Sequence, residues 1–501
     1  MSATPTTLLD LIRPNPDGSA AVIVPEHNVT ITYGALRRNV EALAEQLAAA
    51  GVRRGDRVGI ALPNGLPVVV AFLAAAEVGT AAPLNPAYKA DDFAFYLEDT
   101  NAKVLILPPD GADDARRAAG DRVPVLPVDM DAAGAVALTT VSGRKPYPRP
   151  TKDDVALILH TSGSTGRPKR VPLTHANLTI SAQNVARHYR LTKDDVSMCV
   201  MPLFHVHGLV ASTLATLATG GTLVVPAKFN PLSFWRTARD TGMTWYSAVP
   251  TIHQLLLARG ADPNRRPEGA ARLRFIRSCS AALPPPVMEA LETAFGAPVL
   301  EAYGMTEAAH QMASNPLPPD ERRAGSVGRG TDVQIGIMDD EGNLLAPGKA
   351  GEVVIKGPNV ITGYENNPEA NAKSFTNGWF RTGDQGILDE KGYLTLVSRI
   401  KELINRGGEK ISPREIDEVL LTHPAVAEAV AFGVPHATWG EEVAAAVVTR
   451  SEVSEADLIA FCKEKLADFK RPKQIHITTT IPRTATGKIQ RRVVAEAFAK
   501  S

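Results

Sequence analysis

The pattern of apolar and polar positions alternates between two periods along most of the chain. From Tyr33 to Gly51, apolar residues stand at positions 36, 40, 43, 44 and 47, a spacing that places them on one face of a helix. Gly51 is the residue type expected just after a helix. Similar patterns predict a strand at 56–63, a buried helix at 66–78, a turn at 84–88, and strands at 117–129 and 155–160. This alternation predicts a layered α/β architecture.

The chain has 501 residues, which is more than a single hydrophobic core usually serves. The sharpest change of pattern lies near 398–402, where a hairpin-like segment gives way to a turn and a helix capped by Ser412 and Pro413. About 100 residues follow it, a usual size for a small domain. We therefore predict three parts: a large N-terminal domain at 1–398, a hinge at 399–401 and a small C-terminal domain at 402–501.

Composition and charge exclude some classes of partner. Lys and Arg number 54, as do Asp and Glu, so the net charge is zero. Without a basic field, we expect neither nucleic acid nor an anionic membrane as a partner. Cys199, Cys279 and Cys462 cannot close a disulfide framework, which is typical of a reduced cytosolic protein.

Targeting signals are missing from the places where they are usually found. The N-terminus lacks the basic and apolar regions of a secretory signal. The longest apolar run, 66–79, is too short for a membrane span and contains Glu77. The last three residues, Ala-Lys-Ser, differ from the peroxisomal address Ser-Lys-Leu. We therefore expect a cytoplasmic protein. Its oligomeric state, monomer or homodimer, stays open at this point.

The segment HTSGSTGRPKR at 160–170 is the first candidate for chemistry. It follows the apolar run 155–160 and precedes a helical pattern at 174–189, and strand, Gly-rich loop and helix in this order suit phosphate binding through backbone N–H groups and hydroxyls. Pro168 stands where a Walker A loop needs its second glycine, so a P-loop NTPase is disfavoured. A plain Ser/Gly surface loop is the alternative for this segment alone.

Four more stretches follow in order: EAYGMTEAAH (301–310), NGWFRTGDQG (377–386), SRIKELINRGGEKISP (398–413) and PRTATGKIQR (482–491). Together with TSGSTGRPK they resemble the core motifs of the adenylate-forming superfamily, which includes acyl-CoA synthetases, luciferases and peptide-synthetase adenylation domains. Such enzymes join a carboxylate to ATP, release pyrophosphate and pass the acyl group from acyl-AMP to a thiol. The resemblance implies ATP, Mg²⁺ and coenzyme A, and a large adenylation domain of layered sheets and helices with a small, mobile α+β C-terminal domain.

The resemblance also implies roles for single residues at the nucleotide. Tyr303 would stack on adenine, Asp384 would accept the ribose hydroxyls with help from Arg399, Thr306 would contact the α-phosphate, and Glu307 would hold Mg²⁺. The β- and γ-phosphates would lie in the loop, against Thr161, Ser162, Gly163, Ser164, Thr165, Gly166 and Lys169. The rest of the nucleotide site would consist of Ser280, Ala281, Ala282, Glu301 and Gly304.

The C-terminal motifs carry the remaining implied roles. Lys488 would bridge the carboxylate and the α-phosphate during adenylation. Lys401 matches the hinge about which the small domain rotates, and that rotation would bring Gly407 and Gly408 to the site for the pantetheine arm of CoA. The chain departs from the family pattern at two positions: Arg170 and Ser398 each stand where many relatives have glycine.

Polar residues in separate segments suggest which carboxylic acid is the substrate. His205, in PLFHVHG, matches the histidine that gates the acyl pocket in the family. The run of His310, Ser314, Asn315 and Pro316, with SCSAAL (278–283) upstream, looks similar to the oxalate–CoA ligases of the superfamily. The resemblance implies that His207, Ser280 and His310 would hold the distal carboxylate of a very small diacid. A zinc site on His205 and His207 is disfavoured because no third ligand has suitable spacing.

Other functions stay open at this point. The acid could instead be a medium-chain, aromatic or other small carboxylic acid, with the histidines in ordinary packing positions. An adenylation module that loads a carrier protein and a non-catalytic nucleotide-binding protein are further alternatives. The absence of a carrier domain after 482–491 disfavours the first of these two, and the presence of Lys488, Glu307 and Asp384 disfavours the second.

Overall fold

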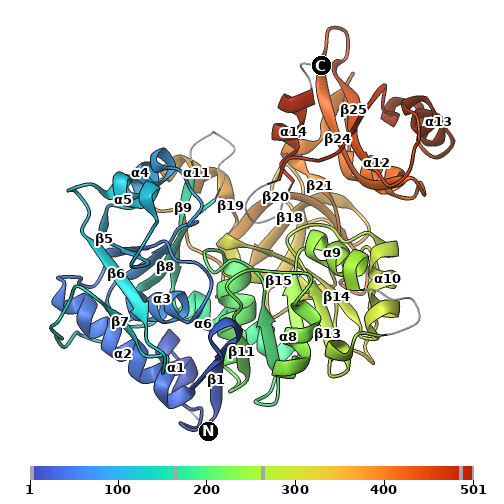
Figure 1. The fold of residues 1–501 in the computed structure, drawn as a ribbon. Coiled ribbons are helices and arrows are strands. Elements are labelled where there is room, and N and C mark those ends of the chain that lie inside the picture. Colours follow the sequence, from blue (N-terminus) through green and yellow to red (C-terminus); the bar gives the residue numbers. More distant parts are fainter. Residues whose placement is uncertain (1–4, 162–167, 261–265, 484–488, 499–501) are drawn as a thin grey trace.

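The computed structural model describes residues 5–161, 168–260, 266–483 and 489–498. Figure 1 shows a large body, coloured blue to orange, and a smaller C-terminal part that stands on one side of it. Both parts combine helices and sheets, so the predicted fold class, a large N-terminal α/β domain with a small α+β domain, is confirmed.

Two large sheets form most of the body, and both are mainly parallel. The nine-stranded sheet has the order β16 (Arg329–Gly330), β15 (His310–Ser314), β14 (Val299–Met305), β13 (Phe275–Ser278), β12 (Trp245–Ala248), β10 (Val196–Cys199), β11 (Thr222–Val224), β1 (Ala20–Val24), β2 (Val29–Thr32). The seven-stranded sheet has the order β7 (Val136–Leu138), β6 (Val125–Met130), β5 (Ala102–Leu107), β3 (Arg57–Ile60), β4 (Thr80–Pro83), β8 (Val155–Thr161), β9 (Lys169–Thr174).

Helices pack on these sheets around one large apolar core and several smaller ones. Helix α3 has its apolar residues all round rather than on one face, and nearly all of them are buried. The helices of the body are α1 (Leu8–Ile12), α2 (Tyr33–Ala49), α3 (Leu66–Val78), α4 (Ala90–Asp99), α5 (Asp113–Ala119), α6 (His175–His188), α7 (Ala215–Leu217), α8 (Phe234–Thr241), α9 (Pro250–Gly260), α10 (Pro285–Phe295) and α11 (Pro368–Ser374). Shorter turns are the 3₁₀ helices η1 (Pro25–His27), η3 (Glu268–Ala270) and η4 (Thr306–Ala308), and a π-helix, η2 (His207–Leu214), leads into α7.

An antiparallel sheet lies next to the small part (Figure 1) and completes the body. Its strands are β17 (Gln334–Met338), β18 (Ala350–Lys356), β19 (Phe375–Thr376), β20 (Trp379–Leu388) and β21 (Leu394–Arg399). The 3₁₀ helix η5 (Ile400–Glu402) follows β21 and leads to the small part. The proposed hinge at 399–401 therefore lies in the connection between two sheets, which is a suitable place for a hinge.

The small part is built around a second five-stranded sheet. Its strands are β22 (Ile404–Arg406), β23 (Glu409–Ile411), β24 (Val426–His436), β25 (Gly440–Thr449) and β26 (Gln474–Thr478). Its helices are α12 (Pro413–Leu421), α13 (Glu455–Lys465), the 3₁₀ helix η6 (Asp468–Lys470) and α14 (Arg491–Phe498). The sheet has its own apolar cores on its two faces.

The predicted helices at 33–51 and 66–78 and the predicted strand at 155–160 are confirmed as α2, α3 and β8. The predicted order of strand, loop and helix after residue 160 is wrong. A strand, β9, comes before helix α6 and pairs antiparallel with β8, with Thr161 opposite Lys169. The loop therefore joins two strands of a hairpin, and Lys169 begins a strand.

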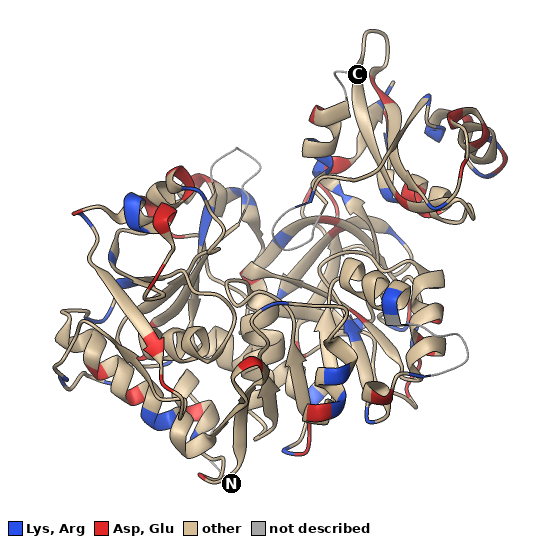
Figure 2. Ribbon diagram, in the orientation of Figure 1, with Lys and Arg blue, Asp and Glu red and all other residues tan. Residues whose placement is uncertain are grey.

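Charged residues of both signs occur on the body and on the small part (Figure 2). This distribution agrees with the net charge of zero. Among the described residues, every helix is too short or too polar to cross a lipid bilayer.

Candidate active site

Tyr303, Asp384 and Arg399 meet where β14, β20 and the end of β21 come together. The Tyr303 hydroxyl donates to Asp384 Oδ2, and Arg399 Nε lies 3.1 Å from Asp384 Oδ1. Burial, together with the neighbouring Asp384 carboxylate, raises the pKa of Tyr303 well above its ordinary value. The structure thus brings together the side chains expected at adenine and ribose, and both Asp384 oxygens have a partner within this group.

Glu307 lies in η4, and its carboxylate is buried. Its Oε1 accepts a hydrogen bond from the Tyr364 hydroxyl at 2.9 Å and lies 3.4 Å from Thr161 Oγ1. Lys169 Nζ lies 4.0 Å from the centre of the Tyr364 ring. Burial lowers the pKa of Lys169, the Glu307 carboxylate opposes this shift, and the Lys401 charge adds to it. Sequence reasoning missed Tyr364, which connects two of the expected residues.

Arg170, one of the departures from the family pattern, lies in a charged cluster beside this site. Its Nε lies 3.1 Å from Glu365 Oε2 and 3.7 Å from Asp99 Oδ2. His160 Nε2 contacts the same Asp99 oxygen at 2.9 Å. Arg170 therefore ties β9 to the end of α4 and to the segment that carries Tyr364, a role that glycine could not have.

His207 is the first residue of the π-helix η2 and is fully buried. Its Nδ1 lies 3.1 Å from Ser280 Oγ, and its Nε2 lies 2.6 Å from Ser247 Oγ. The backbone N–H of His207 donates to Nδ1 of His205, so the two histidines of the HVH motif are also connected. π-Helical turns are rare and are often found at functional sites.

His310 lies beside His207, with ring centres 5.1 Å apart. Its φ of 108° and the φ of 76° at Ser280 are unusual for residues with a side chain, and such strain gathers at functional sites. A Cβ at Gly304 would come within 2.2 Å of the His310 carbonyl oxygen, so glycine is required there. The three residues expected to hold a distal carboxylate are thus adjacent.

Arg277, in β13, lies next to His207 and His310. Sequence reasoning did not identify it. It is fully buried, and it contacts both His207 and His310. Its neighbour across the parallel sheet is Ser247 of β12.

The other expected nucleotide residues surround the same region. Thr306 begins η4 and is buried, whereas Ala281 and Ala282 are exposed. Glu301 is buried and accepts a hydrogen bond from the Leu283 backbone at 3.1 Å. Burial raises the pKa of Glu301 to about 7.

In the small part, Gly407 and Gly408 form the two-residue turn between β22 and β23. Both have positive φ, at 59° and 93°, as a hairpin turn of this length favours. A Cβ at Gly407 would lie 2.7 Å from the Trp439 ring. Lys401, the expected hinge residue, is exposed in η5. The expected loop residues Ser162, Gly163, Ser164, Thr165 and Gly166, and Lys488, lie outside the described residues.

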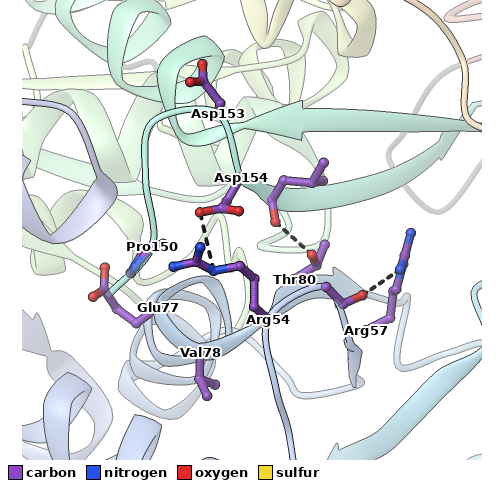
Figure 3. A pocket seen from close by; sticks show the side chains of 11 residues that line it. Arg54, Arg57, Glu77, Val78, Thr80, Pro150, Asp153 and Asp154 are labelled. Atoms are coloured by element: carbon purple, nitrogen blue, oxygen red, sulfur yellow. Dashed lines mark hydrogen bonds and ion pairs between the residues drawn. The ribbon is translucent and has the colours of Figure 1, made fainter. Parts of the chain in front are cut away.

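A pocket of about 250 Å³ lies elsewhere, beside the first residues of β3, β4 and β8 (Figure 3). Its charged side chains include Arg54 and Asp154, which pair with each other at 3.6 Å, and Glu77. Ligands of parallel α/β sheets bind at the opposite, carboxyl ends of the strands. This pocket is therefore separate from the nucleotide site.

Comparison with known proteins agrees with this geometry. The AMP-binding enzyme family matches residues 12–365, and the AMP-binding enzyme C-terminal domain matches residues 415–488. A probable CoA ligase of Humulus lupulus is 50% identical over 93% of this chain and 91% of its own length. The oxalate–CoA ligase of Arabidopsis thaliana is 48% identical over 96% of each chain.

The fold also matches a solved structure over its full length. The crystal structure of ATP-bound MatB from Rhodopseudomonas palustris superposes with a TM-score of 0.90, covers 99% of each chain and is 31% identical. The matched family covers more than half of the chain, and the relatives are similar over nearly all of it. The chain belongs to the AMP-binding enzyme family, and it is an adenylate-forming acyl-CoA synthetase.

Proposed function

We propose that the chain is an ATP-dependent oxalate–CoA ligase. It would form oxalyl-AMP and pyrophosphate, and then oxalyl-CoA and AMP. The observation that carries the choice of acid is the cluster of His207, Ser280 and His310, which offers hydrogen-bonding groups where a long apolar acid would need an apolar tunnel. The similarity to the oxalate–CoA ligase of Arabidopsis thaliana supports the same acid.

In the first half-reaction, the chain must hold two anions together. Tyr303 and Asp384 would hold adenine and ribose, with Arg399 at the carboxylate. Thr306, Lys169, Thr161 and the loop 162–166 would hold the phosphates. The remaining residues of the nucleotide site would be Ser280, Ala281, Ala282, Glu301 and Gly304.

Glu307 is the proposed Mg²⁺ ligand. It fits a hard cation, because its carboxylate is buried beside the Thr161 hydroxyl and is fixed by Tyr364. Mg²⁺ would neutralise phosphate charge when bound. The residues of the chain supply the position: Tyr364 orients the carboxylate, and Lys169 adds a charge above the Tyr364 ring.

Lys488 is proposed to reach the carboxylate and the α-phosphate from the small domain during adenylation. His205 would gate the acyl pocket. Rotation at Lys401 would then bring Gly407 and Gly408 to the site, where the absence of side chains leaves room for pantetheine. Lys488→Ala should abolish acyl-AMP formation and leave thioester formation from supplied acyl-AMP intact. Equal loss of both half-reactions would contradict this role.

The decisive experiment measures CoA-dependent AMP formation with oxalate, malonate, acetate, octanoate and 4-coumarate. We expect oxalate to have the highest kcat/KM. A higher value for octanoate or 4-coumarate would keep the ligase chemistry and overturn oxalate as the acid. Turnover with a carrier protein but without CoA would identify an adenylation module instead.

A further inference from the structure

Arg277 is a buried cation that has no carboxylate partner among the described residues. Its side chain is fully buried in β13, an inner strand of the nine-stranded sheet. Nε donates to the Tyr189 hydroxyl at 3.0 Å and to Gln311 Oε1 at 3.1 Å, and Nη2 donates to Gln311 Oε1 at 2.9 Å. Nη1 donates to Ser247 Oγ at 2.9 Å. All these acceptors are neutral, so the positive charge is solvated by dipoles and is not cancelled.

A buried, uncancelled charge is costly, and a guanidinium does not lose its proton. Most buried arginines are paired with a carboxylate, and this chain shows such a pair elsewhere, between the partly buried Arg491 and Asp417. An anion that binds next to Arg277 would offset the free-energy cost of burying this charge. The groups between Arg277 and the proposed acyl pocket are His207 and His310, which its Nη1 and Nη2 contact at 3.4 Å each.

The direction of the hydrogen bonds follows from the chemistry of Arg277. A guanidinium only donates, so Nε2 of His207 and Nδ1 of His310 are acceptors. The proton of a neutral His207 ring is then on Nδ1, which donates to Ser280 Oγ at 3.1 Å. This leaves the Ser280 hydroxyl proton to be donated elsewhere. In the same way, the proton of His310 is on Nε2. Arg277 thus determines which nitrogen of each histidine carries the proton. As a result, the Ser280 hydroxyl and Nε2 of His310 are hydrogen-bond donors.

We propose that Arg277 is a positioning residue that fixes Ser280 and His310 as hydrogen-bond donors and, by its uncancelled charge, restricts the site to acids with a second anionic group. This inference rests on the proposed function, because it explains how that same site would select oxalate. Arg277 acts through its neighbours and is not assigned a contact with the substrate.

The test compares oxalate with glyoxylate, which has the same size but a neutral group in place of the second carboxylate. In Arg277→Met, kcat/KM for oxalate should fall by about 10- to 100-fold, mainly through KM, while kcat/KM for glyoxylate should change less than about threefold. Arg277→Lys keeps the charge and should restore part of the preference. Arg274→Met, which removes an arginine paired with Asp195 just before the same strand, is the matched control and should leave the ratio unchanged.

A second variant keeps the arginine and tests the charge directly. Gln311→Glu places a carboxylate on Arg277, and the same loss of oxalate preference is expected without loss of thermal stability. This variant decides the matter if Arg277→Met fails to fold. An unchanged ratio of oxalate to glyoxylate in a folded Arg277→Met or in Gln311→Glu overturns the inference alone. Absence of oxalate turnover in the unaltered enzyme overturns the proposed function, and this inference with it.

Discussion

Arg277 in the body is fully buried and Arg491 in the small part is partly buried, and their charges are balanced differently. Arg491 Nη2 lies 2.5 Å from Asp417 Oδ2, and its Nε lies 3.1 Å from Glu402 Oε2. Arg277 contacts hydroxyls, an amide oxygen and imidazoles. A carboxylate partner makes an arginine a part of the scaffold, since the pair is complete. An arginine with neutral partners keeps its attraction for an added anion.

Glu77 shows a third way in which a buried ionisable side chain is accommodated. It is buried near the end of α3, and its Oε1 has no hydrogen-bond partner among the described residues. Burial raises its pKa to about 7, so this carboxyl can become neutral by binding a proton. Arginine lacks this option, which is why the uncancelled charge of Arg277 calls for a functional explanation and the buried carboxyl of Glu77 does not.

The largest effect is expected from removing the paired arginine. Arg491→Met leaves Asp417 buried without its cation, and breaking such a pair costs about 3–5 kcal/mol. We expect the small domain to unfold at a clearly lower temperature, which calorimetry can measure. Arg492→Met, at the next residue of α14, removes an exposed arginine and should change little. Equal stability of the two variants would show that the Arg491 pair does not hold the small domain together.

The buried carboxyl of Glu77 should make the stability of the protein depend on pH. As pH rises from 4.5 to 7, Glu77 ionises in the unfolded chain while it stays protonated in the folded one, so its contribution to stability falls over this range. Glu77→Gln removes this loss, worth up to about 3 kcal/mol. The melting temperature of Glu77→Gln should therefore exceed that of the unaltered protein at pH 8 by more than at pH 5. The exposed Glu390→Gln is the control, and an equal difference at both pH values would contradict the prediction.

A smaller effect is expected at the substrate side of Arg277. His310→Ala removes one donor to an anion, a bond worth about 1.5–3 kcal/mol. KM for oxalate should rise about 10- to 100-fold, and KM for ATP should stay the same, as steady-state kinetics can establish. His188→Ala, which removes a histidine that contacts the Asn315 backbone, should leave both values unchanged. Unaltered oxalate kinetics in His310→Ala would return His310 to a packing role.

The smallest effect is expected from one of the neutral partners. Tyr189→Phe removes a hydroxyl that accepts from Arg277 and lies 2.7 Å from Ser314 Oγ. We expect a loss of about 1 kcal/mol in stability by thermal unfolding. The oxalate-to-glyoxylate ratio should stay the same, because the charge remains. A large fall in this ratio would mean that geometry, and not charge, sets the preference.

The sequence was sufficient for elements with strong periodicity and for the family. Helices α2 and α3 follow from their apolar spacing, and the five motifs indicate the family with little ambiguity. Strand β9 was missed because its six residues directly follow a Gly- and Pro-containing loop and precede a strong helix pattern. For so short a segment, the pairing with β8 decides the structure, and pairing is not visible in local sequence.

Arg277 was missed for a related reason. A single charged residue within an apolar segment usually points to solvent, and only the position of β13 between two other strands places it inside. Its partners come from the end of α6, from η2, β12 and β15, which are far apart along the chain. His207, Ser280 and His310 were predicted from resemblance and not from spacing, since nothing in the sequence alone shows that they meet.

The pairing of β1 with β11 has a consequence for synthesis. Val22 lies opposite Leu223, so about 200 residues must be made after the first strand before its partner exists. At about 5–20 residues per second, this wait lasts roughly 10–40 s on the ribosome. During that time the apolar helix α3 has also been made, and the part of its core that comes from later segments is still missing. The nascent N-terminal half is therefore expected to depend on chaperones, and fragments that end before β11 should aggregate when expressed alone.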